Sequence, residues 1–180
     1  KQVLGNEQVT WYYVVSLIGK TLVLLIAPIN TIVISYLTKR KELLTRSQFG
    51  KAVLAGGGVS LVFFLACQVG TPLFVWLFYR NLYDSVKGLV TVVNLAQILG
   101  LFSAFLFILV LTFTDEKWQL WIQLAHFAVL LVTSVLAARA YGMIGFAWAS
   151  LGANSLRVAA VIILGLVKAG KDKGGSNADR

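Results

Sequence analysis

The sequence predicts an all-α membrane protein, built as a bundle of five transmembrane helices. Of the 180 residues, 58% are hydrophobic and 13% are charged, whereas soluble domains are roughly 45–50% apolar and about 25% charged. The apolar residues form five continuous runs, at about 11–37, 52–78, 86–113, 118–138 and 146–167. A membrane β-barrel would instead alternate apolar and polar residues. At about 1.5 Å per residue, each run is long enough to cross a hydrocarbon core of roughly 30 Å as a helix.

The first two runs each contain a feature that is unusual in a membrane helix. Run 11–37 has one formal charge, Lys20, near its middle. A charge at that depth is unfavourable unless it faces a protein interior or a water-filled cavity. The second run has the sequence AGGG at 55–58 and a proline, Pro72, near its end. The small residues predict close approach of a neighbouring helix, and the proline predicts a kink in the last turns.

The remaining runs follow one another through short connections. The loop YRNLYDS leads to the third run, and the tight connection TDEK makes the third and fourth runs antiparallel neighbours. The turn RAYGMIG joins the fourth run to the fifth. We expect residues 1–170 to form the helical bundle and residues 171–180, which are polar and Gly-rich, to form a disordered cytoplasmic tail. Because the chain begins at Lys1 and its first ten residues are not a signal peptide, we expect a fragment of a longer protein.

Lysine and arginine residues in the flanks predict the orientation of the helices. The two residues Lys20 and Arg157 lie within runs, and the other fourteen lie on one side or the other. One side holds four, namely Lys1, Arg80, Lys87 and Arg139. The opposite side holds ten, at positions 39, 40, 41, 46, 51, 117, 168, 171, 173 and 180. The positive-inside rule therefore predicts a multi-pass protein of the cytoplasmic membrane with its C-terminus in the cytoplasm.

Polar residues gather on one face of several runs when they are placed at 100° per residue. Such faces are expected to turn away from lipid, either to form hydrogen bonds between helices or to line a lumen. His126 is either a structural histidine or a proton-coupling residue. The polar residues in question are Tyr13, Ser16, Lys20 and Thr31 in the first run, Ser60, Cys67 and Thr71 in the second, Asn94 and Gln97 in the third, Gln119, Gln123, His126 and Thr133 in the fourth, and Ser150, Asn154 and Arg157 in the fifth.

Lys20 and Arg157 are the two charges that need a specific explanation. Each lies roughly 14–16 Å from the predicted outer end of its helix, which is too deep for the side chain to reach the interface easily. No Asp or Glu lies within any run. The pair therefore predicts a hydrated cavity that attracts an anion. The alternatives are a carboxylate on helices outside this fragment, or helix borders that differ from those assigned here.

The sequence offers nothing that indicates catalysis or a cofactor. No cluster resembles a metal site, no nucleophile has a base beside it, and AGGGVS lacks the lysine of a phosphate-binding loop. No basic cluster lies beside stacking aromatic residues, so no nucleic-acid partner is expected. We expect no enzymatic activity, no cofactor and no metal.

Three stretches resemble a known family in their order and spacing. Residues 4–37 combine a Gly-containing turn, an aromatic pair and a helix with a central proline, and a basic loop follows them. Residues 73–85, LFVWLFYRNLYDS, are rich in aromatics, and residues 141–150 contain a Gly-x-x-Gly-x-Ala-x-Ala pattern. Together they resemble the C-terminal lobe of Wzx-like polysaccharide flippases, which belong to the multidrug/oligosaccharidyl-lipid/polysaccharide exporter superfamily. Arg80-Asn81 departs from the family pattern, in which a glycine usually follows the aromatics.

The resemblance implies that these helices form most of one lobe of a two-lobe transporter, with the N-terminal lobe as partner. It implies movement of a saccharide linked to undecaprenyl diphosphate across the bacterial cytoplasmic membrane, for lipopolysaccharide or other surface polysaccharide biosynthesis. We expect Lys20 and Arg157, found from the sequence itself, beside the anionic head group. Residues expected to line the lumen or to couple transport are Asn94, Gln97, Gln123, His126 and Asn154.

Three alternatives to the flippase remain. A drug or cation antiporter of the same superfamily is expected to carry buried carboxylates, which the runs lack. A small membrane assembly subunit without transport activity leaves the two mid-membrane cations unexplained. A membrane glycosyltransferase would need acidic residues near the interface, and Asp84, Asp115 and Glu116 are few and scattered.

Overall fold

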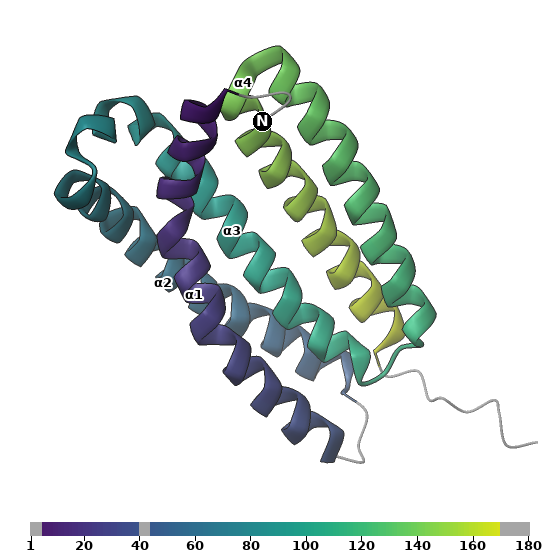
Figure 1. Cartoon of the computed structure of the whole chain (residues 1–180). Coiled ribbons are helices and arrows are strands. Elements are labelled where there is room, and N and C mark those ends of the chain that lie inside the picture. The colour runs from purple at the N-terminus through teal and green to yellow at the C-terminus, as the bar shows by residue number, and fades with distance from the viewer. Residues whose placement is uncertain (1–4, 40–43, 170–180) are drawn as a thin grey trace, which may run out of the picture.

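The computed structural model describes residues 5–39 and 44–169, with the backbone alone at 25–31, 33–34, 36–39 and 116. Apart from short connections, the chain is helical in these ranges and contains no strand there. The disordered tail expected at 171–180 lies outside them, as do Lys1, Arg40 and Lys41. In chain order the elements are α1 (Asn6–Lys39), α2 (Arg46–Phe78), the short 3₁₀ helix η1 (Arg80–Leu82), α3 (Tyr83–Leu111) and α4 (Glu116–Lys168), as Figure 1 shows.

Helix α4 reverses direction at Gly142, so its two arms lie side by side (Figure 1). Gly142 has φ 64° and ψ −144°, a backbone conformation that residues with a Cβ rarely adopt. The arms are close just beyond this turn, because a Cβ on Gly145 would collide with the backbone of Ala137. The first arm spans 116–141 and the second 143–168, with the reversal inside the turn RAYGMIG that the sequence predicted.

Three helices in the described ranges are long and apolar enough to cross a membrane, at Arg46–Phe78, Arg80–Leu111 and Lys117–Lys168. Many large apolar side chains on them are exposed, among them Leu54, Val69, Trp121 and Phe127. A surface of this kind fits the hydrocarbon core of a bilayer. The expected all-helical fold is therefore confirmed, and it is compatible with a membrane protein. The expected bundle of five spans is not confirmed, because α1 is not among these three helices and both arms of α4 belong to one of them.

Helix α3 is the centre of the molecule. Its most apolar stretch is 50% buried, compared with 6% for the corresponding stretches of α2 and α4. At one end Val93 lies in an apolar cluster with residues of α1, α2 and α4, and at the other end Leu106 lies in a second cluster with Phe49 and Val161. Helices α1, α2 and α4 each pack against α3. The side chains that α3 presents therefore determine how the other helices meet.

Local sequence explains where α2 begins and how it packs. The apolar run suggested a start near Ala52, but the helix begins at Arg46. Thr45 and Gln48 form a reciprocal capping box, in which each side chain accepts a hydrogen bond from the other's backbone N–H. The close approach expected at AGGG occurs at Gly56, where an added Cβ would lie 2.6 Å from the Phe105 ring of α3. The helix continues through Pro72 to Phe78.

Candidate functional site

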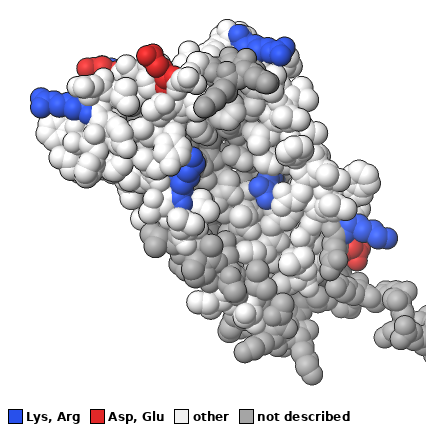
Figure 2. All heavy atoms as spheres, in the orientation of Figure 1, with Lys and Arg blue, Asp and Glu red and all other residues white. Residues whose placement is uncertain are grey.

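The candidate site lies where α1 and the second arm of α4 flank α3. These two helices meet near the Gly142 turn, where the rings of Tyr12 and Phe146 pack edge to face with centroids 5.1 Å apart. Further along, both helices rest on α3. Figure 2 shows Lys and Arg atoms on both sides of a hollow in the middle of this face. The Asp and Glu atoms in this view lie near the margin of the molecule.

Contacts with α3 place the two sides of the site at the same level. On one side, Gly19 of α1 lies against the side chain of Gln97. On the other, Asn154 of α4 donates a hydrogen bond to the carbonyl of Ala96 at 2.8 Å and lies beside Gly100. Lys20 follows Gly19 directly, and Arg157 lies about one turn beyond Asn154. The two cations thus flank one stretch of α3.

Lys20 is exposed on α1. Its ammonium group lies 4.6 Å from the centre of the Tyr13 ring, within the range of a cation–π interaction. No carboxylate among the described side chains pairs with it. The ion pair that the described residues do contain joins Lys87 and Asp84 at the start of α3. Lys20 therefore keeps its charge available to a ligand on the exposed side of α1.

Arg157 is half-buried and has few partners. Its guanidinium carbon lies 4.8 Å from the centre of the Phe107 ring, while its buried Nε has no hydrogen-bond partner among the described residues. It also lines a cavity of about 140 Å³ between the arms of α4, together with His126 and otherwise apolar residues. A planar cation with an unused donor in an apolar setting is suited to binding an anion.

A hydrogen-bonded chain beside Arg157 connects both arms of α4 to α3. The Nε2 atom of His126, on the first arm, lies 3.2 Å from Oδ1 of Asn154, on the second. Since Oδ1 is an acceptor, Nε2 donates in this contact. The amide nitrogen of Asn154 continues the chain by donating to the carbonyl of Ala96. This chain fixes the segment of α4 that carries Arg157.

The other residues predicted for the lumen lie elsewhere. Asn94 is fully buried between α2 and α3, where it bonds to the Cys67 carbonyl and to the side chains of Gln68 and Thr71. Gln123 is exposed on the first arm of α4. The structure thus brings His126, Asn154 and Arg157 together, places Lys20 across α3 from them, and puts Asn94 on a different interface. The side chain of Thr31 lies outside the described residues.

Two residues that take part in these interfaces, Gln68 and Phe107, were not singled out from the sequence. Gln68 bonds to both Asn94 and Thr91, and its i, i+3 spacing from Thr71 was a signal that it shares their face. Phe107, the ring beneath Arg157, gave no signal, because an aromatic residue in an apolar run looks like any other core residue.

The described residues contain no group of three or more His, Cys, Asp or Glu that could hold a metal ion. Comparison with known proteins leaves the chain without an assigned relative: no family model, no curated protein and no solved structure matches it.

Proposed function

We propose that this chain is part of a membrane transporter that moves a lipid-linked saccharide, carried on an undecaprenyl diphosphate, across the bacterial cytoplasmic membrane. The observation that carries the proposal is the pair Lys20 and Arg157. Both lie far from the ends of their helices, both flank the same stretch of α3, and no carboxylate in the described residues neutralises either one. The resemblance of three stretches to polysaccharide flippases supports the same substrate class.

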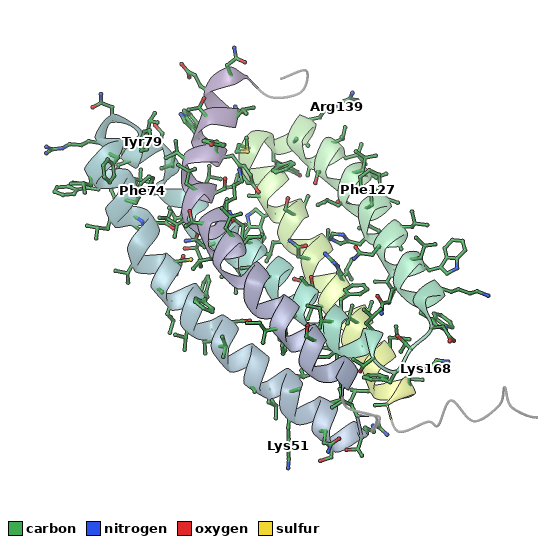
Figure 3. The ribbon with its side chains drawn as sticks, turned by 60° about the horizontal axis from the view of Figure 1, so that its bottom comes forward. Lys51, Phe74, Tyr79, Phe127, Arg139 and Lys168 are labelled. Carbon is green, nitrogen blue, oxygen red and sulfur yellow. The ribbon has the colours of Figure 1, made fainter. Side chains whose placement is uncertain are left out.

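In this proposal α1, α2, α3 and the two arms of α4 are five separate membrane spans. Figure 3 places Lys51 and Lys168 at one end of the molecule and Tyr79 and Arg139 at the other. The first end also holds the last turn of α1 and the first turns of α2 and α4, with Lys39, Arg46 and Lys117, so it is the cytoplasmic end by the positive-inside rule. The second end then faces outward, and a further lobe would pack against these spans to form the complete transporter.

The proposed ligand matches the chemistry of the two cations. A diphosphate presents several anionic oxygens, and guanidinium and ammonium groups are its usual protein partners. Coulomb attraction is stronger in a partly dry groove between helices than in bulk water. Arg157 would supply directed hydrogen bonds, with an Nε that has no partner among the described residues, and Lys20 a mobile point charge from the opposite side of α3.

A cation or drug antiporter fits the site less well. Such a transporter needs a carboxylate within its spans, but Glu7, Asp84 and Asp115 all lie in the first turns of helices or just before them. The described part of the molecule thus offers anion-binding groups at mid-helix and no cation-binding ones. A small assembly subunit without transport activity is the outcome to be expected if neither Lys20 nor Arg157 affects export.

The test is to replace Lys20 and Arg157 singly by alanine in the intact protein and to measure surface polysaccharide at matched protein level. Loss of a charge-assisted hydrogen bond is worth roughly 1.5–3 kcal/mol, so each variant should reduce export by about tenfold or more. Arg157→Lys should retain part of the activity. Lys87→Ala, which removes an exposed cation already paired with Asp84, is the control and should leave export unchanged. Full export by both alanine variants would exclude the proposed anion site.

A further inference from the structure

A second site lies along the first arm of α4, apart from the two cations. It is an apolar groove of about 320 Å³ whose wall includes one residue of the second arm, Phe146. Because Phe146 packs on Tyr12, the groove opens on the side of α4 that faces α1. The residues lining it from the first arm are Phe127, Leu130, Leu131, Ser134, Val135 and Ala138.

Ser134 is the polar exception in this groove. It is 6% exposed, and its hydroxyl has no hydrogen-bond partner among the described residues. Two other hydroxyls of α4 bond to their own helix: Thr133 donates to the Val129 carbonyl and Ser155 to the Leu151 carbonyl. A buried hydroxyl without a partner is unfavourable, so Ser134 points to an acceptor that a ligand brings.

Charged, polar and apolar side chains follow one another in a fixed order along this side of the first arm. Ala138 at its upper end is followed by Arg139, whose side chain extends at that end of the molecule (Figure 3). Ser134 lies eight residues before the Gly142 turn, or about 12 Å from it. Phe127, labelled in Figure 3, lies seven residues further in, about 10 Å deeper. From the end inward, the arm therefore places a cation just beyond the groove, then a hydrogen-bond donor and an apolar floor within it.

We propose that this groove binds a glycerophospholipid with an anionic head group. Such a lipid carries its groups in the same order: a phosphate for Arg139, an ester carbonyl to accept from Ser134, and an acyl chain for the floor down to Phe127. The spacing along the arm agrees, because Ser134 lies five residues, or about 7.5 Å, before Arg139, so that one lipid can reach both. A polyprenyl chain would fit the floor but has no acceptor for Ser134. The site is independent of Lys20 and Arg157.

The test measures lipid binding to the purified full chain in detergent by native mass spectrometry. The probes are dioleoyl phosphatidylglycerol, its ether-linked analogue, which lacks the ester carbonyls, and dioleoyl phosphatidylcholine. The unaltered protein should bind the ester lipid about fivefold more tightly than the ether lipid, as expected for one hydrogen bond. Ser134→Ala should remove that difference, and Arg139→Gln should remove the preference for phosphatidylglycerol over phosphatidylcholine.

Ser155→Ala is the matched control, because it removes an exposed hydroxyl of α4 that is already bonded to its own helix. This variant should bind all three lipids as the unaltered protein does. The comparison of ester with ether lipid needs no variant, so it holds even if Ser134→Ala unfolds. Equal binding of the two lipids by the unaltered protein would overturn the proposal. So would undecaprenyl phosphate displacing phosphatidylglycerol from the unaltered protein and from Ser134→Ala with the same efficiency.

Discussion

Two amides on α3, one turn apart, have opposite surroundings. Asn94 is fully buried against α2, with its oxygen 3.3 Å from the Thr71 hydroxyl and its nitrogen 3.1 Å from the Cys67 carbonyl and 3.2 Å from Gln68 Oε1. Gln97 lies against α1, and neither atom of its buried amide has a hydrogen-bond partner among the described residues. The helix and the functional group are the same, so the difference comes from what each neighbouring helix presents.

The comparison shows that α3 holds its neighbours in two ways. Helix α2 offers a carbonyl and two polar side chains, which fix its position on α3 through bonds with defined directions. Helix α1 offers Gly19 at the corresponding place, so its contact with Gln97 depends on close approach alone. At this level of α3, the described side chains of α1 give Gln97 no hydrogen bond, whereas α2 gives Asn94 three. If the helices of this protein rearrange, we expect α1 to move on α3 near Gln97 while α2 and α3 move together.

The largest effect is expected from Asn94→Ala. Hydrogen bonds between membrane helices contribute about 0.6 kcal/mol each on average, so losing three should lower the free energy of unfolding by about 2 kcal/mol. Thr91→Val, which removes one exposed bond from Gln68, is the comparison and should lose about 0.5 kcal/mol. Reversible unfolding in mixed micelles, followed by circular dichroism, measures both. Equal losses would mean that the Asn94 bonds do not fix α2 on α3.

A smaller loss is expected from Gly19→Ala. The new methyl group would collide with the Gln97 amide, which is the far end of a flexible side chain and can shift, so the loss should be at the lower end of the range for overpacking, about 1 kcal/mol. Gly88→Ala in α3 is the matched control, because nothing lies near a Cβ built there. The double variant Gly19→Ala/Gln97→Ala should recover stability in the same unfolding assay, since it removes the group that collides. A double variant that is less stable than either single one would contradict the close contact.

Hydropathy was sufficient to predict the helices but not their ends. Runs of apolar residues located α1 to α4, with the last two runs in the two arms of α4, because burial in lipid and the helical hydrogen-bond pattern leave few alternatives. They did not locate the short helix η1, which lies in the stretch read as a loop. The start of α2 at Arg46 depends on the capping box of Thr45 and Gln48, which lies before the apolar run. The T-x-x-Q spacing of a capping box is present in the sequence, but a search for apolar runs does not detect it.

Helical periodicity predicted which polar residues share a face, but not which helix they would meet. Tyr13 and Lys20, predicted to share a face, are in contact, and His126 and Asn154, from two different polar faces, are hydrogen-bonded. Gln123 shares the stripe of His126 yet is exposed. The periodicity fixes angles around one axis, whereas contact depends on the tilt and spacing of two helices. The different surroundings of Asn94 and Gln97 could therefore be identified only from the structure.

The smallest effect is expected from Gln97→Leu, and its sign is opposite to that of Asn94→Ala. Replacing a buried, unpartnered amide by an apolar side chain of similar size removes a desolvation penalty, so the free energy of unfolding should rise by up to about 1 kcal/mol. Gln123→Leu, at an exposed position, should change it less. If Gln97→Leu instead lowers stability, Gln97 has an acceptor or a water in the membrane, and α1 is fixed on α3 as firmly as α2 is.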